Sequence, residues 1–539
     1  MQVKGGIVRD LVFLWAPGGE CDTSRQWRGL SAIHKLGGGM SKYRPYIYVL
    51  AAACLLGMQM RSAAAASGGA EPTHPCRVEG MPNELRCGAV KRPLDPTRPA
   101  GPIIEVHYLV VPAMARNKQP DAVLLLAGGP GQSAIDVAPA VMSRLARLNN
   151  RRDLVFIDQR GTGRSAPLRC TDESRLPVQQ SIDPRQQLER LRQCREDLAK
   201  LPHGDMRFFT TTLAMQDFDA VREQLGVTQW NLIGASYGTR AALEYLRQFP
   251  QGVRRTVIDG VAPPDMVLPV SFSTDAQAAL DALFKACEPD AMAPSACATQ
   301  YPRLRQQWID LLKGLPRQVS VEHPITGKVE RFELTRAALL GLVRAPLYAP
   351  ALASALPAAI DAAANGDFSG FVGLSGAVGN RKSNRLAMGM HFAVVCAEDA
   401  PRIAGALQTP GQDFGVLDAH MYESVCAFWP RGQVPQAFYS VPPATSPVLV
   451  LSGGADPVTP PRHGDRVTQA MGDKAQHIVV PGAGHGVMGT GCMRDVVYRF
   501  IVAASDAGAL PQDAGCATKV PRPPVFLPTQ MGVGKGVQP

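Results

Sequence analysis

The sequence has no long run of like charges, no apolar run long enough to cross a membrane comfortably, and few aromatic residues. Of its 539 residues, 19% are charged, 45% are hydrophobic and 6% are aromatic, a balance typical of a globular protein rather than a disordered or fibrous one. Lys and Arg outnumber Asp and Glu by 56 to 46, a formal charge of +10. These basic residues are scattered and are not interleaved with aromatics along one face, so nucleic-acid binding is not indicated.

The sequence also lacks an internal repeat and any Cys-x-x-Cys or Cys/His spacing of a zinc site, and we expect neither a metal nor another cofactor. A chain of 539 residues can bury a large core, and usual domain sizes would allow several domains. We expect one main domain with a large insertion. The sequence carries no signal for an oligomeric state.

The amino-terminal part contains a segment with the layout of a secretory signal, residues 40–66. It has a positive start at Lys42 and Arg44, then an apolar stretch, and a small-residue cleavage site at the Ala63–Ala66 run. The apolar stretch is too short for a comfortable transmembrane helix. We therefore expect a secreted or periplasmic protein with no stable membrane insertion once the signal is removed.

Residues 1–39 have neither a sustained apolar period nor a targeting pattern. We interpret them as a mis-assigned extension, with Met40 as the true start. The "AAAC" stretch that ends at Cys54 leaves lipoprotein anchoring as the alternative, which is weakened by Ala rather than Leu at the third position before the cysteine.

Ten cysteines remain once the signal is removed, and an even number in an exported chain favours disulfides. Sequence alone does not determine connectivity, and some free buried thiols are the alternative. The order of the cysteines suggests five sequential bridges that close short loops: Cys76 with Cys87, Cys170 with Cys194, Cys287 with Cys297, Cys396 with Cys426, and Cys492 with Cys516.

Several short apolar runs end in glycine-rich or polar turns, as strands of a mainly parallel sheet do. Amphipathic stretches such as "TLAMQDFDAVREQLG" separate them, and this alternation predicts an α/β fold with helices on both faces of the sheet. The runs are "IIEVHYLVV", "AVLLLAGGPG", "DLVFIDQRG", "WNLIGASYG", "RRTVIDGVAP", "SPVLVLSGGADPV" and "AQHIVVPGAGHG".

Ala- and Leu-rich helical segments interrupt this pattern over residues 265–390, together with one hairpin-like piece, "VSVEHPITGKVERFEL". We interpret the interruption as a mostly helical cap inserted over the strand ends. The sheet domain would then consist of residues 75–264 and 391–515. The Pro- and Gly-rich end, residues 516–539, is expected to form a flexible tail.

Ser236 lies in Gly-x-Ser-x-Gly, between the strand-like "WNLI" and the helix-like "TRAALEYL". This context indicates a nucleophile elbow rather than an ordinary turn serine. Glycines are needed at 234 and 238 because the turn is sharp and a Cβ would clash with the backbone.

A serine nucleophile needs a histidine base and an orienting carboxylate, which follow here in the order Ser, acid, His. Asp456 in "GGADPVTP" and His485 in "GAGHG" each come directly after an apolar run. The alternatives are an Asp-Pro turn and a turn histidine. Three nearby rivals are placed less well, namely His463, Asp465 and His477.

The tetrahedral intermediate of such chemistry needs backbone donors for its oxyanion. We assign the amide of Tyr237, next after the nucleophile, and that of Gly129 in "GGPG" (128–131). A plain Gly-Pro turn is the alternative for the second assignment.

The combination of "GGPG", "DQRGTGRS" (158–165), "GASYGTR", "GGADPVTP" and "GAGHG", with "LYAPALASALPAAIDAAANGD" in the helical insertion, resembles the secreted α/β-hydrolases related to proline iminopeptidase and tripeptidyl aminopeptidase. The resemblance runs from about residue 75 to 515. It implies the α/β-hydrolase fold, with a TAP-like region at the carboxyl end of the sheet domain, and an exopeptidase acting on free amino termini. Some relatives are carboxylesterases. The prolyl enzymes favour a histidine before GGPG, where this chain has Ala127, and that favours the tripeptidyl branch.

An aminopeptidase must bind a cationic α-amine with a carboxylate. The stretch "MHFAVVCAEDAP" (390–401) resembles the corresponding family segment and suggests Glu398 first and Asp399 second, with a helix-start or surface carboxylate as the alternative. Asp158 and Arg160 in "DQRGTGRS" are interpreted as a structural ion pair.

The sequence therefore predicts a secreted serine exopeptidase that uses Ser236, His485 and Asp456 on short peptides. A carboxylesterase with the same triad, acting on small esters, is the first alternative. A non-catalytic binding protein on the same fold is the remote one.

Overall fold

The computed structural model describes residues 72–172, 175–288, 295–379, 385–406 and 409–527. The expected extension, the expected signal and Cys54 lie outside these residues. None of the helices in these ranges has the length and apolar character needed to cross a membrane.

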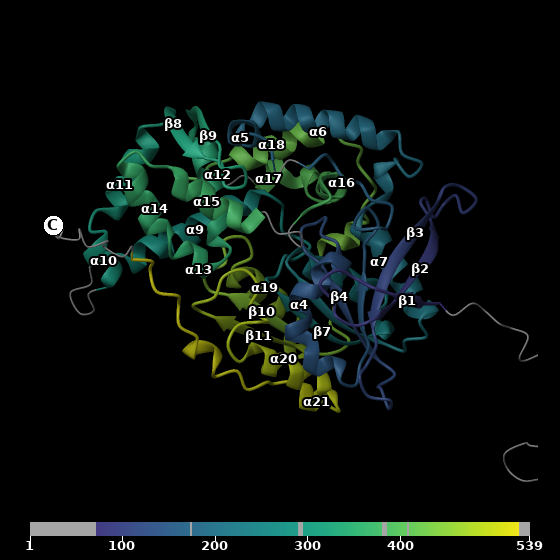
Figure 1. Cartoon of the computed structure of the whole chain (residues 1–539). Coiled ribbons are helices and arrows are strands. Elements are labelled where there is room, and N and C mark those ends of the chain that lie inside the picture. Colours follow the sequence, from purple (N-terminus) through teal and green to yellow (C-terminus); the bar gives the residue numbers. More distant parts are fainter. Residues whose placement is uncertain (1–71, 173–174, 289–294, 380–384, 407–408, 528–539) are drawn as a thin grey trace, which may run out of the picture. The chain divides into compact units, whose positions relative to one another are not determined.

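A nine-stranded sheet lies at the centre of the described residues, in the order β1-β2-β3-β5-β4-β6-β7-β10-β11 (Figure 1). The pairs between β5 and β11 are parallel, whereas β1, β2, β3 and β5 pair antiparallel in that order. The predicted mainly parallel sheet is confirmed, and it is extended by two strands that the sequence analysis did not name, β1 and β2. The strands are β1 (His74–Cys76), β2 (Leu85–Pro93), β3 (Ile103–Val111), β4 (Ala122–Leu126), β5 (Leu154–Ile157), β6 (Trp230–Ala235), β7 (Val253–Asp259), β10 (Val448–Gly453) and β11 (Ala475–Val480).

Helices cover both faces of the sheet because side chains alternate along each strand. Leu124 of β4 packs into one hydrophobic cluster, whereas its neighbours Val123 and Leu125 pack into another on the opposite face. The first face carries α6 (Pro184–Ala199), α7 (Thr211–Gln224), α8 (Tyr237–Gln248), α16 (Met388–Glu398), α18 (Leu417–Cys426) and α19 (Pro461–Met471), and the second carries α4 (Ala134–Asn149), α20 (Met493–Val502) and α21 (Asp506–Ala509).

The chain between β7 and α16 surrounds a third hydrophobic cluster of its own. Its hairpin pairs β8 (Arg317–Glu322) with β9 (Val329–Leu334) in antiparallel register. A short helix from earlier in the chain, α5 (Val178–Ile182), joins this cluster, and the Val178 amide donates to Glu330 Oε2 at 2.7 Å. The cap helices are α9 (Val270–Ala286), α10 (Ala296–Gln300), α11 (Leu304–Lys313), α12 (Arg336–Leu347), α13 (Pro350–Ala353), α14 (Leu356–Ala364) and α15 (Ser369–Gly379).

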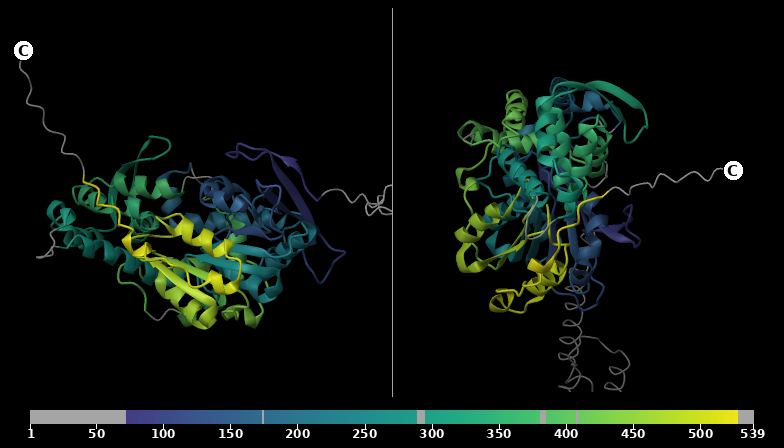
Figure 2. Two further views of the ribbon diagram at one scale, coloured as in Figure 1. Left: turned by 90° about the horizontal axis from the view of Figure 1, so that it is seen from below. Right: turned by 90° about the vertical axis from the view of Figure 1, so that its left-hand side faces the viewer.

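The chain after Cys516 runs from the sheet domain toward the cap helices (Figure 2). The Phe526 amide donates to the Ser354 carbonyl oxygen at 2.9 Å, and the Tyr301 hydroxyl donates to the Phe526 carbonyl oxygen at 3.1 Å. Phe526 is thus bonded to the cap, while Ala517 and Val520 pack into a hydrophobic cluster of the sheet domain. This part of the segment 516–539, which was expected to be flexible, makes defined contacts. Residues 528–539 lie outside the described ranges.

Five disulfides pair the ten cysteines of the described residues, and the pairs are those expected from the order of the cysteines. They close loops with sequence separations between 10 and 30. The Cys396–Cys426 bridge joins α16 to α18. This number of disulfides is typical of a protein that folds in an oxidising, extracytoplasmic compartment. The pairs are Cys76–Cys87, Cys170–Cys194, Cys287–Cys297, Cys396–Cys426 and Cys492–Cys516.

Candidate active site

Ser236 lies between the end of β6 and the start of α8, in a backbone conformation that side chains rarely adopt. Its φ is 55° and its ψ is −125°. Among the described residues, only Ala166 shares a positive φ with Ser236 outside the glycines. Such strain persists only where the surrounding structure enforces it, and it is characteristic of a nucleophile elbow.

The two glycines that flank the serine are required by close backbone contacts. A Cβ at Gly238 would lie 2.1 Å from the Leu126 carbonyl oxygen, and one at Gly234 would lie 2.4 Å from the Gly238 carbonyl oxygen. The elbow therefore packs directly against the end of β4, where "GGPG" begins. A Cβ at Gly128 would in turn lie 3.3 Å from Ser236 Cβ.

Asp456 and His485 meet at the ends of β10 and β11. His485 Nδ1 lies 2.8 Å from Asp456 Oδ2, and Asp456 also accepts the backbone amides of Val458 and Thr459 at 2.9 Å. The Thr459 hydroxyl lies 2.7 Å from Asp456 Oδ2 and 3.0 Å from His485 Nδ1. The acid and the imidazole are thus held in one fixed arrangement.

The electrostatics of this pair favour its charged form. Burial alone would lower the pKa of His485, but the charge and hydrogen bond of Asp456, with a smaller contribution from Asp259, raise that pKa above its ordinary value. Burial would likewise raise the pKa of Asp456, and the imidazole with the backbone amides lowers it below its ordinary value. An imidazolium that forms at His485 is therefore stabilised.

Ser236 and His485 approach the same residue pair, Asp259 and Gly260, at the end of β7. The Ser236 amide donates to the Asp259 carbonyl oxygen at 3.0 Å, and a Cβ at Gly260 would lie 3.3 Å from His485 Cε1. Within the described ranges, no hydrogen bond joins the Ser236 hydroxyl to His485. Catalytic hydrogen bonds are commonly long in ligand-free structures and tighten when substrate binds.

The expected oxyanion donors lie beside the nucleophile. Tyr237 begins α8 directly after Ser236, and Gly129 has a φ of 110° in the loop that contacts the elbow. The amide of Gly128 is already used, since it donates to Gln132 Oε1 at 3.0 Å, whereas the described residues offer no partner to the amide of Gly129.

The start of α16 holds this glycine loop in place. The Ala387 amide donates to the Gly131 carbonyl oxygen at 2.9 Å, and His391 Nδ1 lies 3.1 Å from the Pro130 carbonyl oxygen. Because a carbonyl oxygen only accepts, Nδ1 carries the hydrogen of that bond. His391 Nε2 lies 2.8 Å from the Tyr422 hydroxyl, and burial lowers the pKa of His391. The sequence analysis missed this histidine, which no motif marks.

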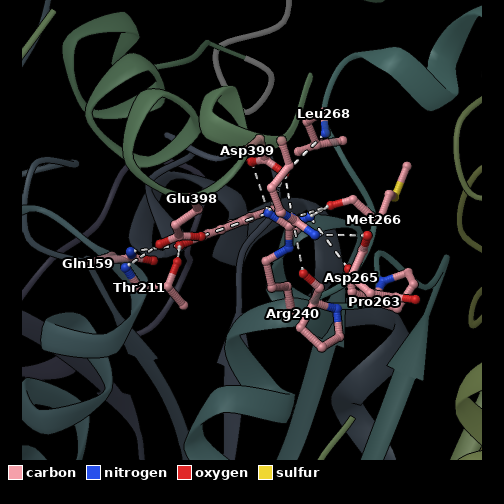
Figure 3. Close-up of polar contacts among 12 residues, drawn as sticks. Gln159, Thr211, Arg240, Pro263, Asp265, Met266, Leu268, Glu398 and Asp399 are labelled. Atoms are coloured by element: carbon pink, nitrogen blue, oxygen red, sulfur yellow. Dashed lines mark hydrogen bonds and ion pairs between the residues drawn. The ribbon is translucent and has the colours of Figure 1, made fainter. Parts of the chain in front are cut away.

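The other end of α16 carries the two acids proposed for amine binding, and they form a buried cluster with α8 (Figure 3). Glu398 is fully buried, and its Oε1 accepts the Thr211 amide at 2.8 Å. Its Oε2 lies 3.8 Å from Arg240 Nη1 and has no hydrogen-bond partner among the described residues. Burial raises the pKa of Glu398 to about 7, against the opposing effect of Arg240.

Asp399, the second candidate for amine binding, is instead occupied by partners within the fold. Both of its carboxylate oxygens contact Arg240 Nη1, at 3.0 and 3.1 Å, and Oδ1 also accepts the Leu268 amide at 3.0 Å (Figure 3). Because this carboxylate neutralises a fully buried guanidinium, we assign Asp399 a structural role.

Asp158 and Arg160 do not form the expected ion pair with each other. Asp158 accepts the Ser133 hydroxyl at 2.6 Å, while Arg160 makes a two-point contact with Asp217 of α7 at 2.7 and 2.8 Å. Both residues are buried and support the loop. They are therefore structural, as expected, but each is bound to a partner other than the one expected.

The rival residues near the proposed triad are engaged elsewhere. His477 contacts Asp465 through Nδ1 at 2.8 Å and the fully buried Ser452 through Nε2 at 2.9 Å. His463 lies 3.0 Å from Asp275 of the cap helix α9. Each of these histidines is thus hydrogen-bonded to an acid other than Asp456.

The cap reaches the catalytic loop through Tyr348, directly after α12. The centroid of the Tyr348 ring lies 5.2 Å from that of the His485 ring, in an edge-on arrangement. The Tyr348 carbonyl oxygen accepts the His485 amide at 2.9 Å. One helical turn earlier, Arg344 pairs with Asp418 of α18. Asp418 lines a cavity of about 400 Å³ between α9, α18 and α19, together with Asp265 and other polar residues.

Sequence reasoning missed Thr459 and Tyr348. Thr459 could have been found, because it lies three residues after Asp456 in "ADPVT". In a turn that begins with an aspartate, a hydroxyl at this spacing can hydrogen-bond to the aspartate side chain. Tyr348 is brought to His485 only by the docking of the cap, and no local signal marks it.

Two family models match this chain. The model described as "alpha/beta hydrolase fold" matches residues 121–286, and the model described as "TAP-like protein" matches residues 412–516. Together they cover β4 through α9 and the region that holds Asp456 and His485.

Three relatives align over most of their lengths. Serine protease Hip1 of Mycobacterium tuberculosis is 25% identical in an alignment 490 residues long. The alignment covers 79% of this chain and 88% of that protein. Tripeptidyl aminopeptidase of Streptomyces coelicolor is 25% identical over 480 residues (82% and 85%). Carboxylesterase B of Mycobacterium tuberculosis is 26% identical over 466 residues (80% and 86%).

Proposed function

This chain belongs to the α/β-hydrolase family as a serine hydrolase with a TAP-like carboxyl-terminal region, and from that premise we propose that it is an exported aminopeptidase. It would remove short peptides, tripeptides in the first instance, from free amino termini. The five disulfides and the signal-like segment 40–66 support export to the periplasm or the exterior.

In the proposed mechanism, Ser236 attacks the scissile carbonyl carbon while His485 Nε2 takes the hydroxyl proton. Asp456 orients the imidazole through Nδ1 and stabilises the imidazolium. The amides of Gly129 and Tyr237 donate to the oxyanion. His485 returns the proton to the leaving amine, and water activated by the same histidine then hydrolyses the acyl-enzyme.

The observation that carries the catalytic part of the proposal is the Asp456–His485 pair at 2.8 Å, beside a serine held at a φ of 55°. Fluorophosphonate labelling tests it: the folded wild-type protein should be labelled, and Ser236→Ala should not. A folded wild-type protein that resists labelling contradicts the triad.

The relatives and the cavity support short peptides as substrates. Two of the three relatives are named as a protease and an aminopeptidase. The cavity between α9, α18 and α19, at about 400 Å³, falls in the range of sites for small ligands, and its lining includes none of Ser236, Asp456 and His485.

Glu398 is proposed as the carboxylate that binds the substrate α-amine. Its Oε2 lacks a hydrogen-bond partner among the described residues, and an ammonium placed there would stabilise the ionised form. Its side chain is fully enclosed in the free protein, so binding requires neighbouring side chains to move apart. Asp418, which lines the cavity, is the acid against which Glu398 has to be tested.

The activity test compares a tripeptidyl amide that carries a free amino terminus with the same compound acetylated at that position. An aminopeptidase cleaves the free compound and loses most of its rate on the acetylated one. Equal rates on the two compounds would contradict exopeptidase action while leaving the serine hydrolase assignment intact.

Glu398→Gln and Asp418→Asn then identify the amine-binding acid. We expect Glu398→Gln to raise KM for the free peptide by about tenfold or more, the scale of one lost charge-assisted hydrogen bond, and to leave turnover of a small ester nearly unchanged. If Asp418→Asn shows this selective loss and Glu398→Gln does not, the amine site is in the cavity instead.

Carboxylesterase B among the relatives supports ester hydrolysis as the second candidate function. The same triad would act on small carboxylic esters without an amine requirement. The test compares kcat/KM for esters with kcat/KM for peptides that carry the same acyl group and a free amine. Values for the esters that lie far above those for all of the peptides would favour this alternative.

A further inference from the structure

Asp259, the last residue of β7, contacts both halves of the proposed catalytic machinery. Its carbonyl oxygen accepts the Ser236 amide at 3.0 Å. Its carboxylate accepts the Val487 amide at 2.8 and 2.9 Å and the Met488 amide at 2.7 Å. These amides directly follow the loop that carries His485, so one residue connects the nucleophile turn to the histidine loop.

The Asp259 carboxylate is buried and has no cationic side chain as a partner. It is 4% exposed, and none of the ion pairs among the described residues includes it. Three other buried aspartates are paired with guanidinium groups, namely Asp121 with Arg152, Asp217 with Arg160, and Asp399 with Arg240. Asp158 resembles Asp259 in that it is buried without an ion pair among the described residues.

An unpaired buried carboxylate costs free energy, because burial disfavours the charged form. Burial raises the pKa of Asp259, while the Val487 and Met488 amides and the nearby His485 oppose this. A Cβ at Gly486, the residue directly after His485, would lie 4.0 Å from Asp259 Oδ2. The carboxylate thus lies beside the histidine loop, and the imidazole of that loop is a cation only when it has accepted a proton.

We propose that Asp259 is a positioning residue of the catalytic centre. It holds the His485 loop against the Ser236 turn through the Val487 and Met488 amides, and its charge stabilises the imidazolium that forms when Ser236 attacks. The inference rests on the serine hydrolase mechanism proposed above, but not on the identity of the substrate.

The charged and titratable groups that face His485 come from three elements. Asp456 follows β10 and contacts Nδ1, Asp259 ends β7, and the Tyr348 ring follows the cap helix α12. Burial raises the pKa of Tyr348 to about 12, so it stays neutral at ordinary pH. Among the residues that the structure describes, the carboxylates of Asp456 and Asp259 are the negative charges that raise the pKa of His485.

Asp259→Asn removes the charge and keeps the shape. Its one remaining oxygen, placed where Oδ2 lies, can still accept the Val487 and Met488 amides, while its NH2 group replaces the Oδ1 acceptor of Val487. Turnover of a small ester and the rate of fluorophosphonate labelling are measured against pH. We expect kcat to fall about tenfold, the equivalent of about one pKa unit, with KM unchanged. The acid limb of the profile should move to lower pH, because removing a negative charge lowers the pKa of His485.

Asp259→Ala removes the acceptor as well, and we expect it to lose about a hundredfold or more in kcat. Asp465→Asn is the matched control, because Asp465 pairs with His477 away from the centre and should retain wild-type rates. Circular dichroism and thermal unfolding check that each variant is folded. If the alanine variant does not fold, the isosteric asparagine variant decides the test.

A folded Asp259→Asn variant with wild-type kcat and an unmoved acid limb would overturn the role of Asp259. An Asp259→Asn variant whose KM rises while its kcat and the acid limb of its pH profile stay unchanged would also overturn this role. Labelling of the wild-type protein separates this result from the proposed function, since an unlabelled wild type overturns the serine mechanism and this inference with it.

Discussion

Thr459 donates its hydroxyl to Asp456 Oδ2 at 2.7 Å, and the same carboxylate oxygen lies 2.8 Å from His485 Nδ1. Two donors therefore share one oxygen, which fixes the carboxylate plane toward the imidazole. The threonine thus belongs to the support of the proposed triad, although it need not touch substrate.

Thr459→Val should lower kcat by about tenfold while the protein stays folded. Valine keeps the shape but loses a hydrogen bond worth about 1–2 kcal/mol to a charged acceptor. Steady-state kinetics on a small ester measure the effect, and Thr459→Ser should recover most of the rate. A valine variant as active as the wild type would contradict the supporting role.

The acid limb of kcat/KM should report a pKa above 6.5. His485 accepts a proton only when it is neutral, and Asp456 raises the pKa of His485 above that ordinary value, so activity is lost as pH falls through the raised value. Asp456→Asn should move the limb to lower pH and reduce kcat by about 10³-fold or more. An unmoved limb in a folded variant would argue against the pairing.

Glu398 should make the stability of the wild-type protein depend on pH. Its pKa is raised from 4.5 to about 7 in the folded protein, so the stabilising effect is fully present below pH 4.5 and is lost as pH rises toward about 7. Compared with Glu398→Gln, the wild type should lose up to about 3 kcal/mol of unfolding free energy over this window. Denaturant titrations at several pH values measure it, and parallel curves for the two proteins would contradict the burial effect.

Gly163→Ala should destabilise the protein by about 2–4 kcal/mol or more. The added Cβ would lie 1.7 Å from Asp158 Oδ2, at a φ of 49°, so it combines a clash with backbone strain. Gly226→Ala is the matched control, because its φ is 64° with nothing within 4 Å of the added Cβ, and about 1 kcal/mol is expected. Chemical denaturation compares the two, and equal losses would mean that the Asp158 contact is unimportant.

Local signals in the sequence predicted the sheet and most residues of the candidate site. Apolar runs that end in glycine-rich turns correspond to β3 through β7, β10 and β11. Ser236, Asp456 and His485 were proposed because each follows such a run directly, and the structure places His485 Nδ1 2.8 Å from Asp456 Oδ2. The cap hairpin was likewise visible from its alternating pattern and its turn.

What the sequence did not predict depends on pairings between distant segments. Arg160 pairs with Asp217, 57 residues away, and Asp399 pairs with Arg240, 159 residues away. The expected partnership of Asp158 with Arg160 was wrong because proximity in sequence does not determine which acid a buried guanidinium meets. The burial of Glu398 could not be read from its polar character either, since it follows from the packing of α16 against α6 and α18.

The bond from the His485 amide to the Tyr348 carbonyl oxygen makes the cap a part of the support of the base. The main chain of the histidine loop is held by a cap residue, and the ring of the same residue lies edge-on to the imidazole. A change in sequence or length within the cap that shifts Tyr348 therefore also shifts the His485 loop, although no cap residue belongs to the proposed triad. Substrate selection by the cap and the placement of the base thus depend on the same segment of the chain.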